Sequence, residues 1–310
     1  MSKLTRAAAG VYIIAATPFK DDGRIDYDGI PVLFDFYLNH GVHGLTILGM
    51  MGEAPKLTMA EQQEIAAKML AYAAGKVPVV VGVSASGFAA IAELSDYVMA
   101  KGAAGVMIAP PPTIRGDQAL RGYFKNAVAA IGPDTPFVIQ DFPLATGVIF
   151  SAEIIQELAE TYPSCAMLKH EDWPGLDKIS KPRAMHDRGR ERISILTGNG
   201  GIFLTDELAR GADGAMTGFA YPELLVSLCD LIGKGETARA HDLFDAYLPL
   251  IRYEQQPVMG LMARKYVLKQ RGALASAVAR QPSPPLSPQS AAEIDFLMER
   301  LARKLAALSA

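Results

Sequence analysis

The sequence predicts an α/β protein, a (β/α)8 TIM barrel with a C-terminal helical appendage. Two observations predict this fold: apolar runs with β character alternate with amphipathic helical stretches, and there are eight such runs. Strands that alternate with helices form right-handed βαβ units, and these units build a parallel sheet that is buried on both faces. Eight units are the number that closes this barrel.

The expected elements follow one another with short connections. The expected strands are residues 11–16, 44–48, 77–83, 105–109, 136–140, 165–169, 193–197 and 214–217. The expected helices are residues 27–39, 59–74, 88–100, 117–130, 152–160, 176–186, 201–210 and 222–232. Residues 176–186 fit the helical pattern least well, because Pro182 interrupts them. A doubly wound open sheet is the alternative, but Ala15-Ala16-Thr17-Pro18-Phe19 stands where a Gly-rich dinucleotide turn would follow the first strand.

After residue 232 the pattern changes to helix alone. Helices are expected at residues 236–248 and 258–269, followed by a Pro-rich extended connector at 280–288. A last amphipathic helix is expected from residue 290 or 291 to about residue 307. The expected organisation is therefore a catalytic barrel over residues 1–232 and a helical extension over residues 233–310 that packs on the barrel. Contact between subunits is one function that this extension could serve.

Composition narrows the class of function. The net charge is −3 and no block of Lys or Arg occurs, which argues against nucleic acid and anionic membranes as partners. The two cysteines, Cys165 and Cys229, lie in apolar contexts and suit a reducing compartment. The apolar run at residues 7–16 resembles a signal peptide faintly, but it continues into Thr17-Pro18-Phe19 and fits a first strand at least as well. No apolar stretch is long enough to span a bilayer, so a cytoplasmic protein is expected.

The stretch at residues 165–175 carries the clearest chemical signal. An apolar run ends in Lys169, and the acids Glu171 and Asp172 follow. A buried ammonium loses its hydration unless it is paired or neutral, and a neutral amine is a nucleophile. By itself the pattern favours a strand-end lysine whose ammonium reaches water, and only the organisation of the chain reverses this. In a barrel of this class the C-terminal strand ends line the active site, so Lys169 would point into the mouth, with Glu171 on the same side.

A lysine in this position can form an imine with a 2-oxo acid. Attack of the Lys169 amine on the C2 carbonyl gives an iminium ion that acts as an electron sink. The iminium makes the C3 hydrogen acidic and permits aldol cleavage, aldol addition or loss of water. The barrel assignment therefore favours a Schiff-base lysine at this position over a structural one.

Five motifs in order resemble the dihydrodipicolinate synthase and N-acetylneuraminate lyase superfamily of Schiff-base lyases. They are Gly49-Met50-Met51-Gly52-Glu53, Phe142-Pro143 with Thr146-Gly147, Lys169, Leu196-Thr197-Gly198, and Gly211-Ala212-Asp213-Gly214. The resemblance covers nearly the whole chain. It implies that Lys169 is the imine lysine, that the assembly is a homotetramer, and that no metal or organic cofactor takes part.

The chain also departs from this family at positions that matter for function. Dihydrodipicolinate synthases carry hydroxyl residues where this chain has Met50 and Met51, and a catalytic tyrosine where it has Gln140. Their arginine for a second carboxylate aligns with Ala145, and the tyrosine from a neighbouring subunit falls in residues 110–113. An amide cannot shuttle protons, so dihydrodipicolinate synthase activity itself is not expected.

Two further motifs resemble the branch that holds the L-2-keto-3-deoxyarabonate dehydratases. They are Ile139-Gln140-Asp141-x-Pro143 and Gly214-Ala215-Met216-Thr217-Gly218-x-x-Tyr221-Pro222. Dehydration needs only loss of a C3 proton and protonation of the leaving C4 hydroxyl, whereas retro-aldol cleavage needs a base on that hydroxyl. The expected reaction is therefore dehydration of a 2-keto-3-deoxy sugar acid. A pyruvate-dependent aldolase and a non-catalytic 2-oxo acid binder on the same scaffold are the alternatives.

Roles follow for the candidate site residues. Lys169 forms the imine, Glu171 is the acid/base with His170 and Asp141 as competitors, and Gln140 orients a substrate hydroxyl or water. The N–H groups of residues 50–52 are expected to bind the substrate carboxylate as an anion nest. The expected substrate-binding residues are Gly49, Met50, Met51, Gly52, Thr197, Gly198, Asn199, Thr217 and Gly218. The alternatives are that the two loop glycines serve only a tight turn, that the methionines only pack, and that Glu171 only pairs with a cation. The histidines are scattered, and none has the spacing of a metal site.

Overall fold

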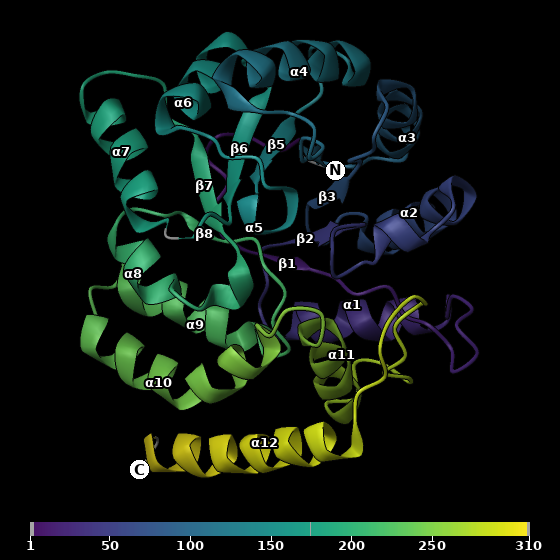
Figure 1. Ribbon diagram of the computed structural model, residues 1–310. Helices are drawn as coiled ribbons and strands as arrows, with labels where there is room; N and C mark the ends of the chain where they lie inside the picture. The colour runs from purple at the N-terminus through teal and green to yellow at the C-terminus, as the bar shows by residue number, and fades with distance from the viewer. Residues whose placement is uncertain (1–2, 174, 309–310) are drawn as a thin grey trace.

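The computed structural model describes residues 3–173 and 175–308, and in this part of the chain eight parallel strands close into a barrel (Figure 1). The strands are β1 (Gly10–Ile14), β2 (Gly44–Ile47), β3 (Val79–Gly82), β4 (Gly105–Ile108), β5 (Phe137–Asp141), β6 (Cys165–His170), β7 (Ser194–Thr197) and β8 (Gly214–Ala215). Every strand pairs with its sequence neighbours, and β1 pairs with β8 to close the ring. The predicted (β/α)8 barrel is confirmed.

Helices connect the strands and cover the barrel from outside. The long ones are α1 (Gly29–Asn39), α2 (Met59–Ala73), α3 (Phe88–Ala100), α4 (Gly116–Ile131), α6 (Ala152–Thr161), α7 (Leu176–Asp187), α8 (Leu204–Ala209) and α9 (Pro222–Gly233). Three short ones lie in the loops at the barrel mouth: η1 (Ala54–Lys56), α5 (Pro143–Thr146) and η2 (Asn199–Gly201). The sequence pattern did not predict the first two, because a single turn of helix is too short to show a period.

Burial explains why these residues form this fold. All residues in the eight strands are buried, because the interior packs one face and the helices cover the other. Each helix turns an apolar face inward, as α4 does with Leu120, Phe124 and Ile131. Local signals set the helix ends: the hydroxyl of Thr58 accepts from the N–H of Glu61, whose carboxylate accepts from the N–H of Thr58.

Several elements are shorter than the sequence pattern predicted, and two of them, β8 and α8, lie next to the site. Strand β8 has only two residues, although the backbone of Met216 and Thr217 still hydrogen-bonds to Thr197 and Ile14 of the neighbouring strands. Helix α8 begins at Leu204 rather than at residue 201, because Gly200 and Gly201 have φ angles of 66° and 76°, which a right-handed α-helix cannot contain. Both differences widen the loops on which the site is built.

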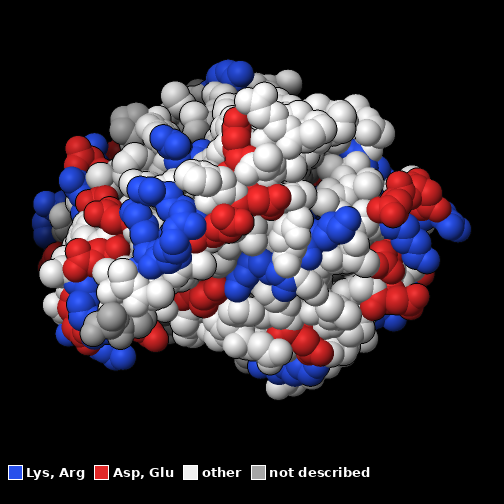
Figure 2. All heavy atoms as spheres, turned by 90° about the horizontal axis from the view of Figure 1, so that it is seen from below, with Lys and Arg blue, Asp and Glu red and all other residues white. Residues whose placement is uncertain are grey.

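Three helices follow the barrel: α10 (Thr237–Glu254), α11 (Gly260–Gln270) and α12 (Pro288–Leu308). Helix α10 packs on α9, and α12 lies across α10 and α11 at the bottom of the view in Figure 1. The division of the chain at residue 232 stays a prediction. Seen from below, acidic and basic side chains are interspersed and no wide field of one sign appears (Figure 2). None of the helices in the described residues is long and apolar enough to cross a membrane.

Candidate active site

Lys169 and Glu171 meet at the C-terminal end of β6. Both side chains are buried, with 3% and 6% of each residue exposed, and the Lys169 Nζ atom lies 2.9 Å from Oε2 of Glu171. The alternation of a β-strand places the two residues on the same side, facing the barrel mouth. A buried amine next to a buried carboxylate can pass its proton over one hydrogen bond, which leaves the amine neutral and nucleophilic.

Gln140 completes this group from the neighbouring strand. The register of β5 and β6 pairs Gln140 with Lys169, so their side chains point to the same side of the sheet. Nε2 of Gln140 donates to Oε2 of Glu171 at 2.7 Å. The three residues that the sequence predicted as catalytic therefore form one hydrogen-bonded group.

Asp141 and His170 face the opposite side of the same two strands. They are paired in the register, both are buried, and the His170 Nδ1 atom lies 3.6 Å from Oδ2 of Asp141. Lys178 of α7 also binds Asp141, at 2.8 Å, and His170 Nε2 lies 2.9 Å from the carbonyl oxygen of Gly175. These contacts place both residues between the barrel and α7, so the geometry favours Glu171 over them as acid/base.

A small cavity of 120 Å³ adjoins Lys169. Its lining residues come from the ends of six strands and from the helices after the barrel: Ile14, Met50, Met51, Phe142, Lys169, Glu171, Asn199, Gly200, Thr217, Gly218, Gln255 and Arg264. Its size suits the head of a 2-oxo acid.

The loop after β2 brings two methionines to this cavity. Met50 is 57% exposed and Met51 only 4%. Leu48 and Glu53, at the two ends of the loop, have φ angles of 53° and 54°, an uncommon left-handed conformation. Within the described chain the N–H groups of residues 50–52 donate to no protein acceptor. That they bind the substrate carboxylate stays a prediction.

The loop is fixed by a buried ionic cluster. Glu53 accepts from Nζ of Lys265 and Nζ of Lys56, both at 2.9 Å, and from the backbone N–H of Arg280 at 2.9 Å. Lys265 has no exposed surface and lies over the ring of Phe19. Burial lowers the pKa of Lys265, and the negative charge of Glu53 opposes this shift. Thus the C-terminal extension holds the loop at the mouth.

The remaining predicted wall residues separate into two groups. Asn199, Thr217 and Gly218 line the small cavity, and the hydroxyl of Thr217 accepts from the N–H of Gly200 at 2.7 Å. Gly198 lies against Glu171, and a Cβ atom there would clash with the side chain of Glu171.

Thr197 does not line the small cavity. The register pairs Lys169 with Leu196 and His170 with Thr197, so the Thr197 side chain points away from the mouth. It contacts Glu207 of α8, whose pKa is raised to about 7 by burial although the Thr197 hydrogen bond lowers it. Thr197 was expected as a wall residue, but the residue of β7 on the side of Lys169 is Leu196, one position earlier.

Sequence reasoning missed Gln255 and Arg264, which reach the small cavity from beyond the barrel. Arg264 Nε donates to Oε2 of Glu254 at 2.6 Å, and Nη1 lies 3.5 Å from the sulfur of Met51. No local motif marks these two residues. The sequence offers one general indication: three helices that follow a barrel must pack near its rim, so some of their residues can reach the mouth.

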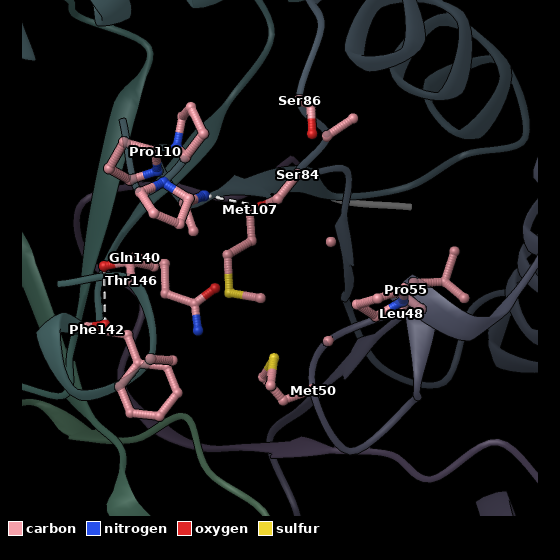
Figure 3. A pocket seen from close by; sticks show the side chains of 18 of the residues that line it. Leu48, Met50, Pro55, Ser84, Ser86, Met107, Pro110, Gln140, Phe142 and Thr146 are labelled. Carbon is pink, nitrogen blue, oxygen red and sulfur yellow. Dashed lines mark hydrogen bonds between the residues drawn. The ribbon is translucent and has the colours of Figure 1, made fainter. Parts of the chain in front are cut away.

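A second cavity, of 390 Å³, opens beside the first and shares Met50 and Phe142 with it. Figure 3 shows Met50, Met107, Gln140 and Phe142 converging on its centre. Pro55 and Pro110 stand on opposite sides of it in the same view. None of the described residues that line it carries a charge. Gly49 lines it as well, and Gly52 packs against the backbone of Leu48, where an added Cβ would lie 3.0 Å from the Leu48 nitrogen.

A model of the dihydrodipicolinate synthetase family matches residues 7–301, nearly the whole chain. The chain belongs to this family. The match confirms the resemblance seen in the motifs and makes the protein a member of a superfamily of Schiff-base lyases.

Similar proteins carry two different names within the family. The chain is 30% identical over 305 residues to an L-2-keto-3-deoxyarabonate dehydratase of Azospirillum brasilense, covering 97% of this chain and 96% of that protein. It is 28% identical over 246 residues to a 4-hydroxy-tetrahydrodipicolinate synthase of Methanococcus maripaludis, covering 78% and 82%. The crystal structure of a dihydrodipicolinate synthase from Rhodopseudomonas palustris is 50% identical, with a TM-score of 0.95, covering 97% of this chain and 100% of that one.

Proposed function

We propose that the protein is a lyase that forms an imine between Lys169 and a 2-oxo acid, and that its reaction is dehydration of a 2-keto-3-deoxy sugar acid. One observation carries the proposal: Gln140 and Lys169 both bind the same oxygen of Glu171 at the mouth of the barrel. This arrangement supplies a nucleophile and an acid/base, and it contains no phenol.

The mechanism begins with proton transfer. Lys169 passes a proton to Glu171 across their 2.9 Å contact and attacks C2 of the substrate. Protons delivered to the C2 oxygen let it leave as water, and the C2=N iminium forms. The iminium withdraws electrons from C3, so Glu171 as carboxylate can remove a C3 proton and give an enamine.

Elimination completes the reaction. The enamine electrons expel the C4 hydroxyl, which takes a proton from Glu171 and leaves as water, so that a C3=C4 double bond remains. Hydrolysis of the imine releases the product, and tautomerisation turns a C5 alcohol on that double bond into an aldehyde. No oxidant is needed, because the loss of water and the shift of the double bond account for every electron.

Retro-aldol cleavage makes a different demand on the site. It requires removal of the proton from the C4 hydroxyl, and the Gln140 amide cannot accept it. Gln140 can hold that hydroxyl in place, however, because it lines the larger cavity next to Glu171. This difference favours dehydration over aldol cleavage.

The larger cavity supports a substrate whose far end is uncharged. Because no charged side chain lines it in the described chain, a second carboxylate placed there would lose its hydration without gaining a partner. Ala145 and Thr146 stand on its wall. The likeness to the Azospirillum brasilense dehydratase, over almost the full length of both chains, supports the same choice.

Dihydrodipicolinate synthesis is the second candidate, because a relative with 50% identity bears that name. The missing charge in the larger cavity and the missing phenol at position 140 speak against it. A non-catalytic 2-oxo acid binder is the third candidate, but a binder gains little from a buried amine beside a carboxylate.

The test has two parts. In the first, the protein is incubated with pyruvate and borohydride and examined by mass spectrometry, and one adduct per chain at Lys169 is expected, absent in Lys169→Arg. In the second, 2-keto-3-deoxy pentonates and hexonates are incubated with the protein, and the products are followed by NMR. A dehydrated semialdehyde from a pentonate, or a dehydrated 2,5-dioxo acid from a hexonate, supports the proposal.

Each other outcome has a definite meaning. Pyruvate as the main product would replace dehydratase by aldolase. Formation of dihydrodipicolinate in a parallel assay would establish the second candidate. Labelling at another lysine, or none with a panel of 2-oxo acids, would refute the imine and leave a binder.

A further inference from the structure

We infer that Arg264 of α11 binds the C1 carboxylate of the 2-oxo acid, in place of the hydroxyl groups that Met50 and Met51 do not provide. The inference rests on the proposed imine at Lys169, since it concerns the same substrate. It assigns a substrate-binding residue to the C-terminal extension, outside the barrel.

The position of Arg264 is the first argument. Its side chain lines the 120 Å³ cavity that also contains Lys169 and Glu171. Among the described residues around this cavity, Arg264 and Lys169 are the cations. Lys169 becomes the iminium nitrogen, so Arg264 is the cation left to receive the carboxylate.

Gly218 makes this approach possible. A Cβ atom at Gly218 would lie 2.9 Å from Nη1 of Arg264, which is too close for an unstrained contact. Any other residue at position 218 would push the guanidinium away from the mouth. Because Gly218 has no side chain, the guanidinium of Arg264 on α11 can reach the cavity.

The guanidinium is held in orientation on its other edge. Nε donates to Glu254 at 2.6 Å, and with the Gln255 amide oxygen turned toward Arg264, Nη2 donates to that oxygen at 3.1 Å. A guanidinium has five N–H groups. Three of them have an acceptor: the N–H of Nε, one of Nη2 and, through the weak contact with the Met51 sulfur, one of Nη1. The other two N–H groups have no acceptor within the described chain.

Arg264 also reaches the loop of the predicted anion nest. Arg264 contacts the side chain of Met51, and the free N–H groups of residues 50–52 belong to the same loop. A carboxylate between the loop and the guanidinium would accept from both. Hydrogen bonds between charged groups are about twice as strong as neutral ones, so the arginine compensates for absent hydroxyls.

A purely structural role is the competing explanation. Glu254 is buried and its pKa is raised by burial, while Arg264 opposes that shift, so the arginine could serve only to neutralise this carboxyl. A structural arginine would affect every ligand alike. A carboxylate-binding arginine would affect only ligands that carry the carboxylate.

The experiment compares two probes that differ in this one group. Borohydride trapping at Lys169 is titrated with pyruvate and with its neutral amide, pyruvamide, on the wild type and on Arg264→Met, Arg264→Lys and Glu254→Gln/Arg264→Met. The double variant removes both buried charges together, which keeps the fold if the single variant is unstable. Arg271→Met is the matched control, because Arg271 pairs with Glu223 and does not line the cavity.

The expected result is a selective loss. Arg264→Met and the double variant should raise the half-saturating pyruvate concentration roughly 10- to 100-fold and leave that of pyruvamide unchanged. Arg264→Lys should lie between, and guanidinium ions at low millimolar concentration should partly restore pyruvate binding to Arg264→Met. Arg271→Met should match the wild type.

Equal effects on both probes, or no effect on pyruvate, would overturn the inference and leave Arg264 as the partner of Glu254. Absence of Lys169 labelling in the wild type would instead refute the proposed imine chemistry. The two failures are therefore distinguishable.

Discussion

Gln140 and Lys169 share one acceptor atom, Oε2 of Glu171, at 2.7 Å and 2.9 Å. The amide of Gln140 directs its N–H to the carboxylate, and it cannot take a proton as a phenol could. Glu171 is thus held by Gln140 and by Lys169. The proposed acid–base role of Glu171 rests on this position.

Glu171→Gln tests that role. The substitution keeps the shape of the side chain but removes its capacity to accept and return a proton. We expect kcat on the preferred 2-oxo acid to fall by about 10²–10⁴, the usual worth of general acid–base catalysis. Borohydride labelling at Lys169 should survive, and steady-state kinetics with intact-mass analysis will measure both.

The control for this variant is Glu207→Gln. Glu207 is also a buried carboxyl near the barrel, but it lies on α8 beside Thr197, on the far side of β7 from the cavity. Its kcat should stay near that of the wild type. A Glu171→Gln variant with full activity would return His170 and Asp141 to consideration.

Glu207→Gln should also change the free energy of unfolding in a way that depends on pH. Burial raises the folded-state pKa of Glu207 from its ordinary value of 4.5 to about 7. Below pH 4.5 the group is protonated in both states. Between these values the unfolded chain ionises while the folded chain keeps the proton, so the free energy of unfolding falls as the pH rises.

Above pH 7 the loss is complete and amounts to about 3 kcal/mol. The glutamine variant avoids this loss. It should be more stable than the wild type at pH 8 by up to that amount, and the gain should shrink towards pH 5. Urea denaturation at both pH values is the measurement, and an equal gain at both would show that the carboxyl does not titrate in this range.

The Glu53–Lys265 pair should behave as a buried ion pair. Glu53→Gln leaves Lys265 with the carbonyl oxygen of Thr17, 3.1 Å away, and without a counter-ion. We expect a loss of about 3–5 kcal/mol of unfolding free energy. Glu53→Gln/Lys265→Met removes both charges and should recover most of this loss.

Lys56→Met is the comparison for that cycle, because Lys56 binds the same carboxylate from a partly exposed position. Its cost should be at most about 1 kcal/mol. Denaturant unfolding of the three variants and the wild type checks the ranking. A double variant as unstable as Glu53→Gln would show that the pair is not the source of the effect.

A homotetramer is the predicted assembly. The resemblance to the family predicted it, and the helices after the barrel offer a surface for contact between subunits. Sedimentation at micromolar concentration should give a mass about four times that of the 33.2 kDa chain. A monomer of this mass would contradict the prediction and would leave support of the mouth loop as the function of the extension.

The sequence predicted the barrel because its signals are local and repeated. Strand cores such as Val79–Gly82 and Gly105–Ile108 are short apolar runs, and each is followed by an amphipathic helix. Lys169 and Glu171 were predictable for the same reason: alternation over two residues fixes their side once the end of β6 is known.

Other site residues were not predictable, because their placement depends on relations between distant segments. Thr197 was expected in the wall, but the register of β7 against β6 puts Leu196 on the side of Lys169 instead. Arg264 comes from a helix 95 residues after Lys169, and only the packing of α10 and α11 brings it to the mouth. Neither relation leaves a trace in the local pattern.

The glycines at positions 198 and 218 have a consequence for how this protein can evolve. Because neither glycine has a side chain, a neighbouring side chain fills the space beside it: Glu171 beside Gly198 and Arg264 beside Gly218. A saturation library at these two positions should therefore lose activity with every replacement, even alanine, although neither residue has a functional group of its own. New substrate preferences would have to arise at the uncharged walls of the larger cavity, where a change of side chain does not displace the groups around Lys169.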